Sequence, residues 1–551
     1  MPAAPARAPL AANLALALGA VLVAGLALAL LEAGLRLAGL PAADPLQPSR
    51  LAYQRVALPL LEPAALADGT PVLRTRDPRL PVQWVAARKP AGALRVFGFG
   101  GSAAAGLGFS PNATPARELE RLLRAALPGR PVEVVNLGIV ALGARQVRQL
   151  LEDVCRVAEP DLLVVYSGNN EFLELHAERY ALATGGAGFR AGEALRGTQL
   201  YRLVGRLLPR AASTPSLAEL ARSQQELRLT QDAIVEKIET RESDVAAAAA
   251  RYAAELGAMA DAAQAAGARL VLARVASNWR WRGREDLPRD WLDELVPAAQ
   301  GPASRRERAE LALARLEARI AAAARFERSE WRFRSALLRE ELGDLAGARR
   351  DYRAAMNEDR RLRRAVDELG DALERVARQR GALYVDSVSA LAADAPHGIL
   401  GFEHFYDYVH FTPRGAAVAG AAIFRALADA GAIAPEPGFD LAARRAQRLA
   451  ALDALAQDPI AVEDWLGIGF GRAGIADRDL WKYEHLASEL DRRIDADPRD
   501  ALALAYRANA RSFRQGQAAA ARADYAAALA AGAPAAPLRA NLARLALRGD
   551  W

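Results

Sequence analysis

Residues Leu94 to Ser102 read LRVFGFGGS, and this run sets the architecture of the chain. Its first six residues are mostly apolar and aromatic, which predicts a strand buried on both faces of a sheet. The glycines Gly100 and Gly101 predict a tight turn directly after the strand. Open α/β sheets bind ligands at the edge where their strands end, so we expect Ser102 to offer its hydroxyl there. A Gly-Gly-Ser loop is common, however, and Ser102 alone defines no function.

Four further runs of the same kind follow along the chain, and helical patterns separate them. The predicted strands are 132–136, 161–166, 269–275 and 382–386. Strands that alternate with helices at this spacing form a mostly parallel sheet with helices on both faces. We therefore predict an α/β fold, a three-layer α/β/α sandwich around a five-stranded, flavodoxin-like sheet.

A base and its orienting acid are predicted near residue 410. His410 lies three residues after Asp407. This spacing lets the carboxylate bind one ring nitrogen while the other takes a proton from Ser102. The alternative is a surface histidine beside an acid. His397 and His404 are rival histidines, and Asp386 is a rival carboxylate.

Two segments that follow predicted strands offer oxyanion donors. They are Asn136-Leu137-Gly138 and Gly168-Asn169-Asn170-Glu171. The backbone N–H of Gly138 and the side-chain amide of Asn170 are candidates, together with the N–H of Ser102. A turn glycine and a helix cap are the structural alternatives for these two residues.

Together these segments resemble the sequence blocks of the SGNH (GDSL-like) hydrolase superfamily, and most of all its membrane-anchored group with tetratricopeptide-like helices. The resemblance covers roughly residues 90–430. It implies a serine esterase in which Ser102 is the nucleophile, His410 the base and Asp407 its orienter. Ser102, Gly138 and Asn170 would form the oxyanion hole. The implied substrate is an acetyl or other short acyl ester on a carbohydrate or lipid, and no cofactor is implied.

Two positions depart from the pattern of that superfamily. Gly101 and Glu171 stand where many members have aspartate. These departures leave two other interpretations open. One is an acyltransferase of the same fold that acts on a polysaccharide. The other is a non-catalytic scaffold whose helical repeats bind a protein partner.

Asn278 and Trp279 are candidate substrate-binding residues. They begin the run Asn278-Trp-Arg-Trp-Arg-Gly-Arg284, which follows the fourth predicted strand and so lies near the same sheet edge. Interleaved tryptophan and arginine suit a carbohydrate or polyanionic ligand or a membrane interface. Packing with a solvated rim is the alternative.

Composition argues against metal and nucleic-acid functions. The chain has one cysteine, Cys155, and five histidines without a His-x-x-x-His spacing, so we predict no metal site. Its net charge of +6 comes almost wholly from arginine. The densest basic run, 360–364, predicts a solvated helix face and no nucleic-acid partner.

An uncharged apolar run from Leu10 to Leu31 predicts a transmembrane anchor, with a cleaved signal peptide as the alternative. The expected location is a single-pass membrane protein whose bulk is periplasmic or otherwise outside the cytoplasm. The predicted organisation is an anchor over 1–40, a linker over 41–90, an SGNH-like domain over 91–435 and a C-terminal helical region over 436–551.

Two stretches resemble tetratricopeptide repeats, in which small residues let paired helices approach closely. One lies in a helical insertion predicted over 185–380, and the other lies near the C-terminus. The residues at the repeat offsets are Gly343, Ala348, Tyr352, Ala355 and Met356 in the first, and Gly516, Ala521, Tyr525, Ala528 and Leu529 in the second.

Overall fold

The computed structural model describes residues 10–38, 54–107, 113–184, 238–281, 291–297, 304–405, 407–456, 487–512 and 517–533, with a few short pieces among 186–219 and 535–542. Its centre is a parallel five-stranded sheet in the order β5-β4-β6-β7-β8. The strands are β4 (Leu94–Gly100), β5 (Val132–Asn136), β6 (Leu162–Tyr166), β7 (Arg269–Ala273) and β8 (Leu383–Val385). All five predicted strands are thus confirmed. Every residue of β4 is buried, as expected for a strand with neighbours on both sides.

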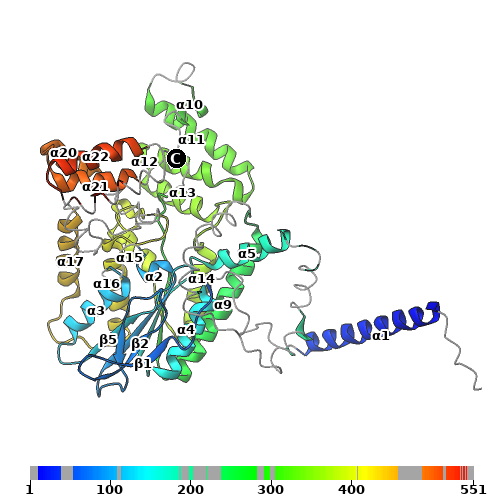
Figure 1. Cartoon of the computed structure of the whole chain (residues 1–551). Helices are drawn as coiled ribbons and strands as arrows, with labels where there is room; N and C mark the ends of the chain where they lie inside the picture. Colours follow the sequence, from blue (N-terminus) through cyan, green and yellow to red (C-terminus); the bar gives the residue numbers. More distant parts are fainter. Residues whose placement is uncertain are drawn as a thin grey trace, which may run out of the picture.

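Helices cover both faces of this sheet (Figure 1). On one face, α3 (Pro115–Ala126) and α16 (Pro413–Asp429) pack against each other and against the edge strands β5 and β8. On the other face, α9 (Glu242–Ala265) packs between α4 (Ala144–Val157) and α14 (Asp367–Arg380). The predicted three-layer α/β/α arrangement is therefore confirmed.

Residues 54–90 are not a linker. From Leu61 they form a small antiparallel sheet of β1 (Leu61–Ala65), β2 (Pro71–Thr75) and β3 (Trp84–Ala86). Leu60, Leu80 and Val85 are buried in the main hydrophobic core. The sequence missed this sheet because its strands are short and rich in proline, which weakens the alternating pattern of a strand.

The predicted membrane anchor forms a helix, α1 (Leu10–Leu37), on which Leu22, Leu26 and Leu30 are exposed. Among the residues that the structure describes, however, no helix combines the length and apolar character required to span a bilayer. The structure therefore does not support the predicted transmembrane span.

Paired helices form at both predicted repeat stretches. In the insertion, α12 (Ser329–Leu342) and α13 (Leu345–Asn357) pack together and bury Ala348, Tyr352, Ala355 and Met356. Near the C-terminus, α21 (Ala501–Ser512) and α22 (Ala518–Ala530) pack together; Gly516 lies outside the described residues. The pairing fits the pattern, and the repeat family itself stays a prediction.

The predicted boundary at residue 436 falls too early. Helix α17 (Leu441–Ala456) packs on α16, and Leu449 and Leu452 belong to the main core. Arg448 also binds both carboxylate oxygens of Glu118 in α3. Helix α17 is therefore part of the α/β body.

The remaining elements are α2 (Ser102–Ala105), α5 (Glu171–Thr184), α10 (Trp291–Leu295), α11 (Arg305–Ala322), α15 (Ser387–Asp394) and α20 (Ala487–Ala496), with short 3-10 turns η2 (Arg325–Glu327) and η3 (Pro396–Gly398).

Candidate active site

Ser102 and His410 lie in direct contact at the carboxyl edge of the sheet. Ser102 is the first residue of α2 and is separated from the end of β4 only by Gly101, and His410 lies in the loop before α16. The Ser102 Oγ is 2.6 Å from His410 Nε2, and both residues are buried. At this distance the serine hydroxyl donates a hydrogen bond to the neutral ring. The predicted contact between nucleophile and base is thus present in the structure.

Asp407 fixes the orientation of that ring. Its Oδ2 lies 2.5 Å from His410 Nδ1, and its Oδ1 accepts hydrogen bonds from the backbone N–H groups of Val409 (2.9 Å) and His410 (2.8 Å). The loop is therefore folded around the carboxylate. Because an ionised carboxylate is only an acceptor, the network assigns the proton to Nδ1 and leaves Nε2 free to accept from Ser102.

The rival residues are engaged elsewhere. Asp386 accepts a hydrogen bond from the backbone N–H of Ser389 and caps α15. His404 is buried and lies 2.8 Å from Asp394. Burial opposes the charged form of His404, but the bonds to Asp394 and Glu403 outweigh it and raise the pKa of the imidazole. His397 is exposed on the surface.

The two glycines before Ser102 are needed because neighbouring segments pack closely against their Cα atoms. A side chain on Gly100 would overlap the carbonyl oxygen of Tyr166 on the neighbouring strand. A Cβ on Gly101 would lie 2.5 Å from Asn170 Nδ2 and 3.0 Å from the carbonyl oxygen of Leu142. An aspartate at position 101 would therefore press on the Asn170 amide and on the Leu142 carbonyl oxygen.

Asn170 lies beside Ser102 through this contact with Gly101. It directly precedes α5, and its Nδ2 donates a hydrogen bond to the Leu142 carbonyl oxygen at 2.9 Å. The amide is therefore held by the loop that follows Gly138. An amide nitrogen carries two hydrogens, so this bond uses only half of its donor capacity.

Gly138 is placed differently from the prediction of a free donor. Its N–H donates to Asn136 Oδ1 at 3.1 Å. A side chain here would overlap the backbone of Ala104 and Ala105, so the glycine lets the loop lie directly on α2. Asn136 also donates from Nδ2 to the Ala104 carbonyl oxygen, which ties the second predicted block to the helix that begins at Ser102.

Glu171 is a partly buried residue at the start of α5. Its Oε1 accepts a hydrogen bond from the backbone N–H of Ala144, the first residue of α4, at 2.9 Å. Burial raises the pKa of Glu171 to about 7, and the Ala144 bond opposes the rise. Its neighbours Glu174 and Glu255 add to the rise. Glu171 therefore caps α4 and takes no part in the hydrogen bonds that link Ser102, His410 and Asp407.

Asn278 and Trp279 lie in the interior of the protein and not on its surface. Both are buried, with exposed fractions of 0% and 5%. The Asn278 N–H donates to the Tyr408 carbonyl oxygen (2.9 Å), and the Trp279 N–H donates to the Leu400 carbonyl oxygen (3.0 Å). These backbone bonds hold the loop that carries Asp407 and His410, and the substrate-binding role of the two residues stays a prediction.

An aromatic rim lies beside His410 instead, formed by Trp281, Phe402 and Tyr408. The Trp281 ring centroid lies 6.1 Å from that of Phe402 and 6.4 Å from that of Tyr408. The Tyr408 ring stands edge-on to His410 at 5.9 Å. Phe402 is 50% exposed and so offers part of its ring to solvent. The clustering of Phe402 and Tyr408 around His410 in the sequence was the signal that could have identified this rim.

The predicted solvated helix face at 360–364 is also wrong. The run is not helical, and although Arg361 and Arg363 are exposed, Arg364 is buried. Its Nη1 donates to the Asn278 carbonyl oxygen at 2.7 Å.

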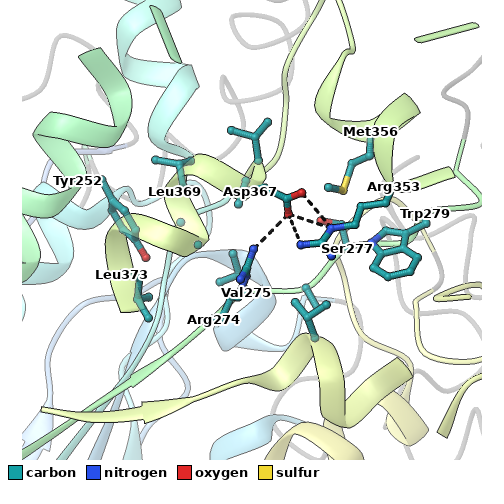
Figure 2. Close-up of a pocket in the computed structure, with 16 residues that line it drawn as sticks. Tyr252, Arg274, Val275, Ser277, Trp279, Arg353, Met356, Asp367, Leu369 and Leu373 are labelled. Atoms are coloured by element: carbon teal, nitrogen blue, oxygen red, sulfur yellow. Dashed lines mark hydrogen bonds and ion pairs between the residues drawn. The ribbon is translucent and has the colours of Figure 1, made fainter. Parts of the chain in front are cut away.

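A small cavity of about 20 Å³ lies behind the loop that carries Asn278. Gly168, Ser277 and Trp279 are among the residues that line it. Figure 2 shows Asp367 on its wall, held by Arg274 and Arg353. The volume suits about one water molecule, so the cavity is not a substrate pocket.

No family model and no curated protein matches this sequence. Among solved structures, a catalytic mutant of an acetylxylan esterase from Geobacillus stearothermophilus aligns at 11% identity, over 64% of this chain and 98% of that one, with a TM-score of 0.29. A protein described as a GDSL-like lipase from Parabacteroides merdae aligns at 11% identity over 61% and 98%, with a TM-score of 0.29. An α/β hydrolase enzyme from the metagenome of Lake Arreo, Spain, aligns at 13% identity over 61% and 96%, with a TM-score of 0.28. Because these scores are low, the interpretation of the site rests on its own geometry.

Proposed function

We propose that this chain is a serine esterase of the SGNH type. The Ser102 oxygen attacks the ester carbonyl carbon while its proton passes to His410 Nε2. His410 then gives this proton to the leaving alcohol, and the acyl group stays on Ser102. Water, deprotonated by His410, attacks the acyl-enzyme and releases the acid, which restores the serine.

The observation that supports this proposal is one continuous hydrogen-bond chain. It runs from Ser102 Oγ to His410 Nε2 (2.6 Å) and from His410 Nδ1 to Asp407 Oδ2 (2.5 Å). A surface histidine beside an acid would not meet a buried serine hydroxyl that is 308 positions away in the sequence. Serine, base and orienting acid are the parts that nucleophilic acyl transfer needs.

The oxyanion donors we propose are Ser102 N–H, Asn170 Nδ2 and Gly138 N–H. The Ser102 N–H lies in the first turn of α2, next to the attacking oxygen. The second Asn170 hydrogen is not used by the Leu142 bond. Gly138 would exchange its 3.1 Å bond to Asn136 for the stronger bond to a negatively charged oxygen.

We propose an acetylated or short-acylated carbohydrate as the substrate. The aromatic rim offers flat apolar faces within reach of His410, and the half-buried charged side chains of Arg280, Glu340 and Glu403 lie nearby. Flat rings beside polar groups suit a sugar ring, whose faces are apolar and whose edges carry hydroxyls. A lipid ester is the alternative.

A fluorophosphonate probe tests the reaction. We expect the purified protein to be labelled once, and we expect Ser102→Ala and His410→Ala to abolish labelling while the variants keep the parent's thermal unfolding temperature. A folded parent protein that is not labelled would favour the non-catalytic scaffold. For a labelled protein, release of free acetate or transfer of acetyl to an added oligosaccharide separates the hydrolase from the acyltransferase.

The aromatic rim tests the substrate class. We expect Trp281→Ala and Phe402→Ala to lower kcat/KM for an acetylated xylooligosaccharide about tenfold each, and to change kcat/KM for p-nitrophenyl acetate less than twofold. Trp84 on β3, which is 51% exposed, supplies the matched control Trp84→Ala. Equal losses on both substrates, or none on either, would contradict the sugar assignment.

The location outside the cytoplasm stays a proposal. An alkaline phosphatase fusion at the C-terminus, which is active only outside the cytoplasm, tests it directly. The protein partner proposed for the paired helices is tested in the same way as any binding surface, by crosslinking in cells and comparison with a chain lacking α20 to α22.

A further inference from the structure

The connection between α13 and α14, residues 358–366, touches two separate parts of the candidate site. We call this connection the brace. Arg364 in the brace donates from Nη1 to the Asn278 carbonyl oxygen (2.7 Å) and from Nη2 to the Trp281 carbonyl oxygen (3.4 Å). The next residue, Ala365, donates its N–H to Asn169 Oδ1 (3.2 Å).

The Arg364 contacts lead to the loop that carries the base. Arg364 holds the turn 278–281 by both of its ends, and this turn is closed internally by a bond from the Arg280 N–H to Asn278 Oδ1. From the same turn, Asn278 donates its N–H to the carbonyl oxygen of Tyr408. Tyr408 lies between Asp407 and His410 in sequence, so a shift of the turn would move the acid and the base together.

The Ala365 contact leads to the other side of the site. Asn169 is buried and directly precedes Asn170, the proposed oxyanion donor. Two adjacent brace residues thus bind the two halves of the site, which come from segments nearly 240 positions apart in sequence (from 169 to 407, a difference of 238).

Both ends of the brace are fastened. Near its start, Thr240 donates its N–H to the Arg360 carbonyl oxygen (2.8 Å), and the Leu362 N–H donates to Thr240 Oγ1 (3.2 Å). Directly after its end, the Asp367 carboxylate binds Arg274 at the end of β7 and Arg353 in α13, as Figure 2 shows. The brace is therefore anchored to the sheet and to the paired helices. Because it is fixed in this way, it can hold the two loops that it contacts in place.

The charge of Arg364 also bears on the site. Burial lowers the pKa of its guanidinium, whereas Asp359, Tyr408 and Asp407 act in the opposite direction. The group stays charged at neutral pH, because an arginine is not deprotonated in proteins. Within the described residues its hydrogen bonds go to backbone carbonyls, so the Asp407 carboxylate is one of the charges that it faces.

We infer that Arg364 is a positioning residue for the proposed esterase site, and that the brace holds the base-bearing loop and the oxyanion-bearing loop in register. Its kinetic consequences rest on the proposed function. The helical insertion is then part of the catalytic machinery's support and not only an appendage of the α/β body.

The test compares Arg364→Met and Arg364→Lys with two controls from the same run, the exposed Arg361→Met and Arg363→Met. The first readout is the rate constant for fluorophosphonate labelling between pH 5 and 9, normalised to the fraction of protein that reacts. We expect Arg364→Met to lower the plateau about 10- to 100-fold. Arg364→Lys keeps the positive charge but loses the planar guanidinium whose two nitrogens bind two carbonyl oxygens, so its plateau should fall as well. Both controls should match the parent.

The second readout does not depend on activity. Amide hydrogen exchange is measured for peptides covering 167–172 and 405–411, with Ser102→Ala present in every variant. We expect faster exchange in both peptides for Arg364→Met and in 405–411 for Arg364→Lys. Unchanged exchange in both peptides overturns the inference, even where labelling slows. If the parent enzyme is not labelled at all, the proposed function fails. Amide hydrogen exchange still tests whether Arg364 holds the two loops in place. If Arg364→Met does not fold, Arg364→Lys decides alone.

Discussion

Gly101→Ala is the most direct test of how the site is packed. Gly101 has φ −84° and ψ −153°, an extended conformation outside the left-handed region that favours glycine. We therefore expect the main effect of the substitution to come from the added methyl group. That group would lie 2.5 Å from Asn170 Nδ2 and 3.0 Å from the Leu142 carbonyl oxygen.

The size of the effect follows from these two distances. A comfortable carbon contact is about 3.5 Å or more, so the amide of Asn170 must retreat by about 1 Å. The 2.9 Å bond from Asn170 to Leu142 cannot absorb such a shift, because hydrogen bonds weaken beyond about 3.2 Å. Loss of one oxyanion donor lowers kcat about 100- to 1,000-fold, equivalent to about 2.7–4 kcal/mol. We expect Gly101→Ala to lose activity by this factor while the free energy of unfolding falls by only about 1–2 kcal/mol.

The assay is kcat/KM for p-nitrophenyl acetate, with unfolding followed in denaturant. Gly129→Ala is the matched control, because a Cβ on Gly129 meets no atom within 4 Å. If the methyl group acts through Asn170, the double variant Gly101→Ala/Asn170→Ala should be no slower than Asn170→Ala alone. Full activity in Gly101→Ala, or strictly additive losses in the double variant, would refute the reasoning.

Three further predictions concern charged groups. Asp407→Asn should lower kcat about 10,000-fold at unchanged stability, since an amide no longer stabilises the charged His410 ring; steady-state kinetics and a thermal melt check both parts. Glu171→Gln should change how stability depends on pH. The folded pKa of about 7 lies above the ordinary value of 4.5, so the parent's contribution from this group is complete below about pH 4.5 and is lost as the pH rises through 7. The variant should therefore gain about 3 kcal/mol relative to the parent between pH 4.5 and 8, and a constant difference in denaturant titrations at these two pH values would contradict this. Arg95→Met should destabilise the fold by about 3 kcal/mol, because the buried guanidinium binds Glu133 at 2.6 Å and the carbonyl oxygen of Ala158 at 2.7 Å; the denaturation midpoint measures it.

The parts of this molecule that sequence predicted well are those set by local pattern. Each strand of the main sheet is a short apolar run, and β4 is apolar throughout because it is buried on both faces. Polar residues directly after such strands fall at one edge of a parallel sheet, so Ser102 and Asn170 could be assigned to the same edge without coordinates. The three-residue spacing of Asp407 and His410 likewise places the carboxylate within reach of the imidazole without help from distant segments.

The sequence pattern did not show which residues are buried where burial depends on segments far away in the sequence. Asn278 and Trp279 follow a strand, as binding residues do, but the loop that leads to His410 packs over them and buries both. Arg364 belongs to a run of arginines that looks solvated, yet the turn at 278–281 offers it two carbonyl oxygens in the interior. Nothing in a local pattern shows which of several arginines points inward.

Gly138 illustrates a different limit. Its position after a strand was predicted, and so was its closeness to Ser102. Its N–H, however, is taken by the side chain of Asn136, two residues before it. Asn136 in turn is held by Gln83, whose side chain accepts from the Asn136 N–H and donates to the Asn136 carbonyl oxygen. Gln83 directly precedes β3 of the small sheet, which the sequence pattern did not show, so the hydrogen bond that occupies the Gly138 N–H could not be predicted.

The long insertion between β7 and β8 is compatible with the fold because its ends return to neighbouring strands. Each doubling of a connection adds only about 0.6 kcal/mol of loop-closure free energy, so lengthening a minimal crossover of about 12 residues to the 274–382 connection costs about 2 kcal/mol. The Asp367 cluster, which joins Arg274 of the sheet edge to Arg353 of α13, supplies contacts that offset a cost of this size. Once the insertion was held in this way, its connection at Arg364 lay within reach of the turn behind Tyr408. A chain segment that is absent from the minimal sheet topology can thus become a support for the base, because the sheet brings its two ends together beside the site.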